Sequence, residues 1–358
     1  MEMAALVDQY FDKYIARYGD TALPGHLKTL RAILRCRTPE SGELYVQCPA
    51  CDHAEWRPIS CGNRHCPKCQ NHNTSQWIDK QQKKLLPVPY FMATFTLPRE
   101  LRPLAWFKQK AIYTLLFKCV SSTLKDFGMN PKHLGAEIGM TMVLHTNTRS
   151  LDYHPHIHAV VPGGGIDRRR HYWKKLKGEY LFNGLALAKV FRARFLAAMQ
   201  EAGLVIPPKV PRKWIAHCVN VGRGIEALKY LSRYLYRGVI SEKNIISNQH
   251  GKVTFKYIDS EAGETKFRSL PGEEFLHLIV QHVLPKGFRR VRDFGFLHSN
   301  AKKLLSLVQL ILQVIIEELV PRSRPVFKCP CCKAAMLIVK FRRYVRSPGL
   351  FSVPPRGV

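Results

Sequence analysis

Two histidines on one short segment are the residues whose types and spacing most directly indicate chemistry. The segment Asp152–Val161 reads Asp-Tyr-His-Pro-His-Ile-His-Ala-Val-Val and is followed by a proline and three glycines. Alternate side chains of a β-strand point to the same face, so His156 and His158 point together while Ile157 points away. Neutral imidazoles are common ligands of divalent metal ions, so this strand predicts a metal site. The alternative is a solvent-exposed strand with one polar face.

A metal site of this kind needs a third protein ligand, and two further histidines are candidates. His145 ends a strand expected over residues 139–145, and a hairpin centred near residues 150 and 151 would bring it opposite His156. His154 lies on the same face as the histidine pair, at the start of its strand. We favour His145 and keep His154 as the alternative. Such a site suits Mg²⁺ or Mn²⁺ with open water positions, although imidazoles alone would also take Zn²⁺.

Downstream, a helix expected over residues 225–238 carries three tyrosines. Tyr230 and Tyr234 are four residues apart and share one helix face, whereas Tyr236 faces elsewhere. Such a pair can be core packing, although a separate leucine stripe on the same helix could do that packing. Beside a metal site, free phenol oxygens are nucleophiles suited to covalent phosphoryl transfer. Attack on a DNA phosphorus would give a 5′-phosphotyrosine link and a free 3′-hydroxyl, and two tyrosines would allow two successive cleavages.

A cysteine block near the N-terminal end predicts a structural zinc site. Two C-x₂-C pairs, separated by 14 residues, place two thiolates on each of two turns and complete a tetrahedron. The four expected ligands are Cys48, Cys51, Cys66 and Cys69. Spare ligands that could replace one member, or belong to a second site, are Cys61, His65 and His72.

A second group of cysteines, Cys329-Pro-Cys331-Cys332, has no neighbouring partner in the sequence. It either recruits a distant ligand or is only a cysteine-rich turn. No secretory signal precedes these eleven cysteines, so we expect a reducing, cytoplasmic compartment and metal binding rather than disulfides.

The charge of the chain points to nucleic acid. Lys and Arg number 56 against 26 Asp and Glu, giving a formal net charge of +30, spread along the whole sequence. A polyanion is the expected partner of such a surface, and DNA or RNA is the default. Arg289, Arg290 and Arg292 are predicted phosphate contacts, the alternative being a solvated basic face. No uncharged apolar run is long enough to span a membrane, so no membrane partner is expected.

The elements that must position these residues follow from hydrophobic periodicity. We expect strands at 90–97, 139–145, 156–161 and 214–221, and a hairpin formed by 253–258 and 265–270. We expect two helices in the first 40 residues. Further helices are expected at 74–86, 101–127, 184–202, 271–282 and 300–319. The fold class is therefore α+β. The expected segments are a helical and zinc-binding module (1–86), a central catalytic domain (87–240), an appended hairpin and helical region (241–325), and a cysteine-containing basic tail, partly disordered (326–358).

These motifs, taken in order, resemble the HUH endonuclease superfamily. The resemblance is greatest to the two-tyrosine transposases of rolling-circle insertion sequences, the IS-ninety-one-like group. The matching stretches cover most of the chain: the block from Cys48 to Cys69, Phe95-Thr-Leu-Pro98, His145-Thr146, His154-Pro-His-Ile-His158, Tyr230-Leu-Ser-Arg-Tyr234, His282-Val-Leu-Pro-Lys-Gly-Phe-Arg-Arg-Val-Arg292 and Phe294-Gly-Phe-Leu297.

The resemblance implies a ferredoxin-like antiparallel sheet with flanking helices, metal ligation by His156 and His158, and attack by Tyr230 and Tyr234. It also implies single-stranded DNA at the ends of a mobile element as substrate, with target DNA as a second partner and the zinc module helping to recognise DNA. Tyr236 departs from the two-tyrosine pattern and leaves open which pair is used. The alternatives are an HUH replication initiator or relaxase, or a non-catalytic zinc-finger DNA-binding protein.

Overall fold

The structure is a computed structural model that describes residues 1–69, 71–176, 178, 180–226, 228–229, 232, 239–259, 262–315 and 326–343. Its helices are α1 (Met3–Tyr18), α2 (Pro24–Leu34), α3 (Asn71–Gln82), α4 (Arg102–Phe107), α5 (Gln109–Met129), α6 (Gly184–Glu201), α8 (Gly272–Val280) and α9 (Lys302–Ile311). Short 3₁₀ helices cover Pro39–Ser41, Arg99–Leu101, Glu242–Asn244, Gly295–Leu297 and Ser299–Ala301. The expected helix over 225–238, with Tyr230, Tyr234 and Tyr236, falls largely outside the described residues.

Within the described residues, the strands form four sheets. They are β1 (Glu43–Gln47), β2 (Ala54–Pro58), β3 (Pro89–Thr96), β4 (Met140–Asn147), β5 (Tyr153–Pro162), β6 (Gly164–Asp167), β7 (Tyr172–Lys175), β8 (Ile215–Arg223), β9 (Ile245–Gln249), β10 (Lys252–Ile258), β11 (Thr265–Pro271), β12 (Val291–Phe294) and β13 (Leu337–Arg342). The largest is a five-stranded antiparallel sheet in the order β12-β4-β5-β3-β8. Its strands β3, β4, β5 and β8 confirm the four strands predicted for the central part of the sequence.

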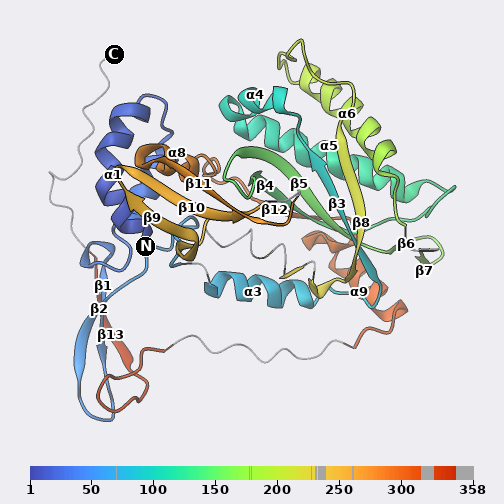
Figure 1. The fold of residues 1–358 in the computed structure, drawn as a ribbon. Helices are drawn as coiled ribbons and strands as arrows, with labels where there is room; N and C mark the ends of the chain where they lie inside the picture. Colours follow the sequence, from blue (N-terminus) through green and yellow to red (C-terminus); the bar gives the residue numbers. More distant parts are fainter. Residues whose placement is uncertain are drawn as a thin grey trace.

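One face of this sheet is covered by helices α4, α5 and α6, which lie above it in Figure 1. Phe95 and Ile157 point into this layer and, with Leu144, are fully buried against it. Helix α6 begins where the Asn183 side chain accepts a hydrogen bond from the Ala186 amide, at 3.0 Å, and it buries Phe191 against Phe95 and Trp214. Because strand side chains alternate, the histidines of β5 must point to the opposite face.

That opposite face has two coverings. At one end, Trp77 of α3 and Val308 of α9 pack on Val143 and Val160 in a second core. Figure 1 shows α3 and α9 on the side of the sheet away from α4–α6. At the other end lies the three-stranded sheet β11-β10-β9. Its β10–β11 pairing, from Lys252↔Pro271 to Ile258↔Thr265, confirms the predicted hairpin.

Helices α1, α2 and α8 share a core with this smaller sheet. Gly272, the first residue of α8, lies so close to the Tyr10 ring of α1 that a Cβ there would be 2.4 Å from it, so only glycine fits. An ion pair of 3.2 Å between Arg17 and Glu273 also joins the two helices. The N-terminal helices are therefore attached to the region around residues 245–280.

A small sheet, β13-β1-β2, joins segments from the two ends of the chain. Strand β1 pairs with β2 on one side and with β13 on the other, in both cases antiparallel. Figure 1 shows this sheet projecting below α1. The segment expected as a basic tail thus contributes a strand to the N-terminal module. Across the described ranges, the structure has no helix with the length and apolarity needed to cross a membrane.

The helix-covered core of the large sheet makes a quantitative prediction. Phe191→Ala should lower the free energy of unfolding by about 3–5 kcal/mol, because the fully buried ring fills the space between Phe95 and Trp214. The matched control Phe107→Ala, at a ring that is 78% exposed, should change it by less than about 0.5 kcal/mol. Urea unfolding followed by tryptophan fluorescence measures both. Equal effects of the two variants would contradict the assigned core.

Candidate metal centres and active-site cleft

Three histidines converge on the face of the large sheet that the helices α4–α6 leave uncovered. The β4–β5 register places His145 directly opposite His156, which confirms the hairpin geometry expected from sequence. One ring nitrogen of each of His145, His156 and His158 lies within 4.8 Å of the others. The Nε2 atoms of His156 and His158 are 3.1 Å apart. Two imidazole nitrogens bound to one ion at about 2.1 Å have a separation of this size, so the set fits a metal ion.

The other ring nitrogens of the pair are held by the surrounding strands. The Nδ1–H of His156 donates to the His154 carbonyl at 2.7 Å, and Nδ1 of His158 lies 2.9 Å from Oγ1 of Thr94 on β3. These partners leave both Nε2 atoms directed at the common point, as expected for ligands oriented by a second layer of hydrogen bonds. The imidazole of His154 instead has its Nδ1 against the Arg102 guanidinium. The ring centres of His145 and His154 both lie 5.1 Å from that of His156, but the cluster of ring nitrogens includes only His145.

Burial keeps these imidazoles in the form that binds metal. Desolvation lowers the pKa of His156 to about 4, and it lowers the pKa values of His145 and His158 well below their usual range. The neighbouring imidazoles act in the same direction on His145 and His158. At neutral pH all three are neutral, so no proton has to be displaced when a cation binds.

The cluster lies in a cleft of about 560 Å³ between the large sheet and β10. The histidines and Thr94 line one side, and the run from Phe255 to Ile258 lines the other, with Val239 and Ile240 at the edge. Two exposed cations, Arg149 and Lys256, also border it. A cleft of this volume can hold one or two nucleotides, and its cations suit a phosphate chain.

The tip of the β4–β5 hairpin is anchored in the core that α8 shares with β9–β11. Leu151 at the tip is buried and adopts a left-handed backbone with φ of 72°. Its carbonyl accepts hydrogen bonds from Nε2 of Gln281, at 2.7 Å, and from Nε2 of His282, at 3.1 Å. Strain of this kind persists only where the surroundings impose it. The hairpin that carries the histidines is thereby fixed to the body that forms the far wall of the cleft.

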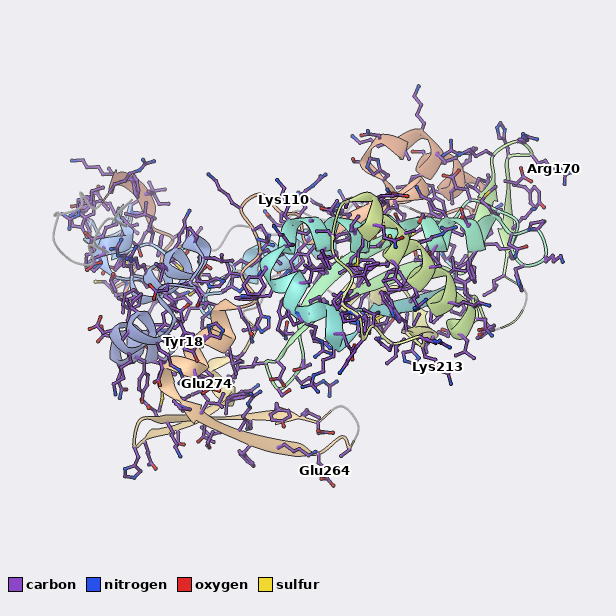
Figure 2. All side chains as sticks on the ribbon, turned by 90° about the horizontal axis from the view of Figure 1, so that it is seen from above. Tyr18, Lys110, Arg170, Lys213, Glu264 and Glu274 are labelled. Carbon is purple, nitrogen blue, oxygen red and sulfur yellow. The ribbon has the colours of Figure 1, made fainter. Side chains whose placement is uncertain are left out.

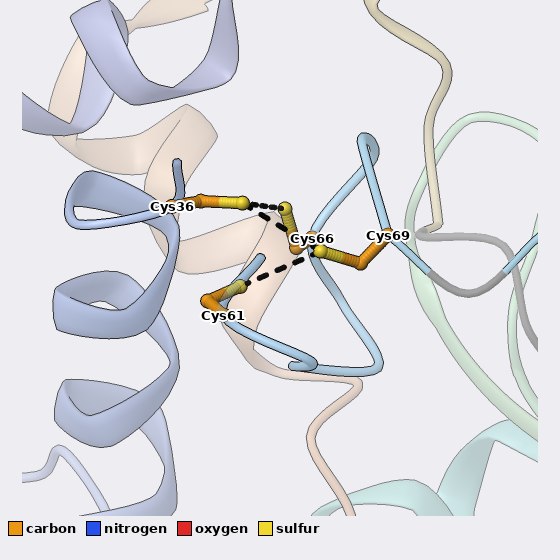
Figure 3. Close-up of side chains that lie close together, drawn as sticks. All are labelled: Cys36, Cys61, Cys66 and Cys69. Carbon is orange, nitrogen blue, oxygen red and sulfur yellow. Dashed lines mark hydrogen bonds between the residues drawn. The ribbon is translucent and has the colours of Figure 1, made fainter. Parts of the chain in front are cut away.

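The cysteines form two clusters, so the predicted grouping of Cys48, Cys51, Cys66 and Cys69 into one site is corrected. The first cluster, drawn in Figure 3, consists of Cys36, Cys61, Cys66 and Cys69. Its Sγ–Sγ distances include 3.5 Å for Cys36–Cys66 and 3.7 Å for Cys61–Cys69. The second cluster consists of Cys48, Cys51, Cys329 and Cys332.

The physical reason for the regrouping is the β1–β2 hairpin. Cys48 and Cys51 lie in its turn, beyond the ends of the strands, whereas Cys66 and Cys69 follow β2 and fold back toward the end of α2. Cys36, just after α2, is a ligand candidate that spacing alone did not reveal. Cys61 takes part as a full member rather than as a substitute. His65 is buried outside both clusters, and the side chain of His72 lies outside the described residues.

The three arginines expected at phosphates lie in different environments. Arg289 is exposed, as a phosphate contact requires. Arg292 is half-buried, and its guanidinium stacks over the Phe117 ring at 4.2 Å. Arg290 is only 7% exposed, and burial lowers its pKa to about 10, with Nη2 donating to the His282 carbonyl at 3.4 Å. Arg290 as a surface phosphate contact is therefore corrected, because its charge lies inside the protein.

Known proteins match this chain over both regions. A family model described as "Transposase zinc-binding domain" matches residues 6–97, and one described as "Putative transposase" matches residues 139–304. The "Putative transposase y4qJ" of Sinorhizobium fredii (strain NBRC 101917 / NGR234) is 31% identical over 325 residues, which cover 84% of this chain and 81% of that protein. The "Transposase for insertion sequence element IS801" of Pseudomonas savastanoi pv. phaseolicola is 28% identical, over 76% of this chain and 70% of that protein.

The chain is thus a transposase with a zinc-binding domain toward its N-terminal end. It belongs to the IS91 family of insertion-sequence transposases. The matched zinc-binding domain contains the first cysteine cluster entirely, and four converging thiols are the donor set of a structural Zn²⁺ site.

The histidine cluster makes a prediction about metal affinity. Thr94→Val should weaken Mn²⁺ binding about 10- to 100-fold, because it removes the hydroxyl that orients the His158 ring. The matched control is Thr96→Val, on the same strand face, since Nδ1 of its neighbour His156 is already held by a backbone carbonyl. Isothermal titration calorimetry of both variants measures the difference, and an equal loss in the control would argue against this role for Thr94.

Proposed function

We propose that this transposase nicks and joins single-stranded DNA at the ends of its insertion sequence, in rolling-circle-type transposition, through a 5′-phosphotyrosine intermediate. The observation that carries the proposal is the cluster of His145, His156 and His158 at the wall of a cation-bordered cleft. Three neutral imidazoles in a cleft are a site for a catalytic cation rather than a structural one, because they leave coordination positions open to substrate.

The chain path supports a ferredoxin-like HUH domain. Apart from the β6–β7 hairpin inserted between β5 and α6, the elements run β3, α4–α5, β4, β5, α6, β8 along the sequence, which is the β-α-β-β-α-β order of that architecture. Both helical segments lie on one face, and the strands β4, β5, β3 and β8 are neighbours in that order. Strand β12 extends this unit by one strand at its β4 edge.

His156, His158 and His145 would hold Mg²⁺ or Mn²⁺. When bound, the cation polarises a non-bridging phosphate oxygen and offsets the charge that develops in the transition state. Thr94 and the His154 carbonyl keep the imidazoles in the orientation that binding needs. Arg149 and Lys256, at the border of the cleft, would hold the neighbouring phosphates of the strand.

Tyr230 and Tyr234 are the proposed nucleophiles, and the described residues around them support this assignment. Leu228 packs in the core shared by Val160 and Trp77, on the histidine face of the sheet. Val239 and Ile240, which follow the tyrosines, line the histidine cleft itself. A phenol gives up its proton as its oxygen attacks the phosphorus, and the bond from phosphorus to the 3′-oxygen breaks. That oxygen takes up a proton as the 3′-hydroxyl, while the 5′-phosphate stays joined to tyrosine. The stored ester bond then allows rejoining to another 3′-hydroxyl.

The surface charge supports DNA as the partner, both as element ends and as target. Lys110, Arg170 and Lys213 are exposed on the part of the molecule built around the large sheet, where Figure 2 shows them well apart from one another. Glu264 and Glu274 lie on the part that carries β11 and α8. Cations so widely spread would contact DNA phosphates, which gives affinity without sequence specificity. Arg289 is a further exposed cation of this kind.

The nucleophile assignment predicts a covalent adduct. The protein incubated with Mn²⁺ and a labelled single-stranded oligonucleotide from an element end should give a protein–DNA band that resists denaturation. The double variant Tyr230→Phe/Tyr234→Phe should give none, because both phenol oxygens are gone. The control Tyr236→Phe should form the adduct at the wild-type level. An adduct that survives the double change would sink the assignment, and no adduct with any end sequence would favour a non-catalytic DNA-binding role.

The metal assignment predicts that loss of a histidine ligand impairs DNA cleavage but not DNA binding. His156→Ala should slow cleavage roughly 10²-fold or more, the size of the loss when a group that stabilises transition-state charge is removed. The affinity for the same oligonucleotide should stay within about threefold, because phosphate contacts on the basic surface supply most of it. Fluorescence anisotropy and single-turnover cleavage measure the two quantities. A parallel loss of both would show that the histidine only maintains the fold.

A further inference from the structure

The cysteines toward the C-terminal end belong to a site that the matched zinc-binding domain does not contain. We propose that Cys48, Cys51, Cys329 and Cys332 form a second structural zinc site, assembled from the two ends of the chain. It is separate from the site at Cys36, Cys61, Cys66 and Cys69. The family match ends at residue 97, so half of the proposed ligands lie outside it.

The sulfur geometry is that of one four-thiolate site rather than of two disulfides. The Sγ atoms of Cys48 and Cys332 are 3.4 Å apart, those of Cys51 and Cys329 are 3.5 Å apart, and all four lie within 4.8 Å of one another. A disulfide would bring one pair to about 2.05 Å and turn it away from the other. Four thiolates around an ion with bonds of about 2.3 Å have mutual distances close to those in the structure.

Both halves of the site are the same local structure, although 284 residues separate Cys48 from Cys332. Each has the sequence Cys-Pro-x-Cys and is followed by a residue with a left-handed backbone, Asp52 with φ of 55° and Lys333 with φ of 65°.

The hydrogen bonds of the two turns also correspond. The amides of Asp52 and Lys333 donate to the carbonyls of Cys48 and Cys329 at 3.1 and 3.0 Å. The amides of those same cysteines donate to the carbonyls of His53 and Ala334 at 2.8 and 2.9 Å. Two equivalent turns that face each other, each presenting two thiols, are the construction of a closed zinc ribbon.

Besides its strand pairing and the contacts of Arg342 with Glu43 and Trp56, the sheet β13-β1-β2 has only a very small apolar core. All six residues of β13 are exposed, and the local core consists of Val46, Met336 and the two sulfurs of Cys48 and Cys329, with a few half-buried neighbours. A core of this size is too small to order a segment that returns from so far along the chain. A metal clip that closes so long a loop supplies the missing stabilisation.

Cys331 provides a matched control within the same turn. Like Cys332 it is exposed, and its thiol interacts with those of Cys329 and Cys51, but it is not a member of the four-sulfur cluster. The geometry therefore assigns Cys332 as the fourth ligand and leaves Cys331 at the edge of the cluster. The variants Cys332→Ser and Cys331→Ser each replace one sulfur atom by oxygen, at adjacent positions, so they differ only in whether a proposed ligand is lost.

The first experiment counts zinc released by a thiol-specific mercurial from the full-length, zinc-loaded protein, with a metallochromic dye as readout. A metal ion held by histidines is not displaced by such a reagent. The wild type and Cys331→Ser should release two equivalents per chain, and Cys332→Ser and Cys36→Ser should each release half as much. The double variant Cys36→Ser/Cys332→Ser should release none. Wild-type release from Cys332→Ser, or an equal loss in Cys331→Ser, overturns the proposal.

A second experiment keeps the proposal testable if a variant folds poorly. A specific protease site is inserted between residues 315 and 326, and the full-length protein is cut there under native conditions. The fragment that begins after the cut should stay bound during gel filtration in the wild type and in Cys331→Ser. It should separate after mercurial treatment and in Cys332→Ser. A fragment that stays bound after all zinc has been released would show that the strand pairing alone holds it, and would overturn the proposed clip.

Discussion

The pairing of β5 with β4 on one side and with β3 on the other determines what the remaining structure can do. A strand at the centre of a sheet has no freedom of register, because both neighbours fix its hydrogen bonds. In this register the odd-numbered residues, such as Ile157, enter the core below α5 and α6, and the histidines point to the opposite face. A slip of one residue would bury two imidazoles under the helices and put Ile157 in the cleft. The helix-covered core therefore holds the histidines where a cation can reach them.

A second constraint fixes the far wall of the cleft. The hairpin between β4 and β5 has Leu151 at its tip. The Leu151 carbonyl accepts hydrogen bonds from Gln281 and His282, the two residues that follow α8. Helix α8 also packs on α1 and on the three-stranded sheet β11-β10-β9. Arg268 of β11 adds hydrogen bonds to the Ser150 carbonyl and to the Asp152 carboxylate, both at 2.8 Å, so several contacts at the hairpin tip join the two walls.

Local patterns predicted much of the site, and long-range contacts decided the rest. The alternation of histidines with Ile157 and the turn near residue 150 are features of one hairpin, so the position of His145 opposite His156 could be read from the sequence. The contact of the His154 ring with Arg102, which is distant along the chain, could not be read in this way, and His145 as the third ligand stays a prediction. The burial of Arg290 could not be predicted either, because the sequence Arg289-Arg290 is the same whether the second arginine is buried or exposed.

The cysteines show the limit of spacing arguments most directly. Two neighbouring C-x₂-C pairs favour a shared ion, but the β1–β2 hairpin keeps them apart, and each pair finds other partners. Cys36 has no C-x₂-C partner of its own, and its role becomes visible only where the chain after β2 folds back on α2. The number of cysteines does indicate two sites. The three C-x₂-C pairs together with Cys36 and Cys61 provide eight thiols, which are enough for two four-coordinate zinc ions.

The position of β13 has a consequence for how the protein is made. Strand β1 has one partner that is synthesised directly after it and another that follows almost 300 residues later, since Arg342 binds Glu43 across 299 positions. During translation, β1 and β2 emerge as a two-stranded ribbon with one open edge, and that edge stays open until residues 337–342 have been synthesised. A chain released early would carry the cleft but an unfinished ribbon. The sheet β13-β1-β2 therefore distinguishes a chain that includes β13 from one that stops before it.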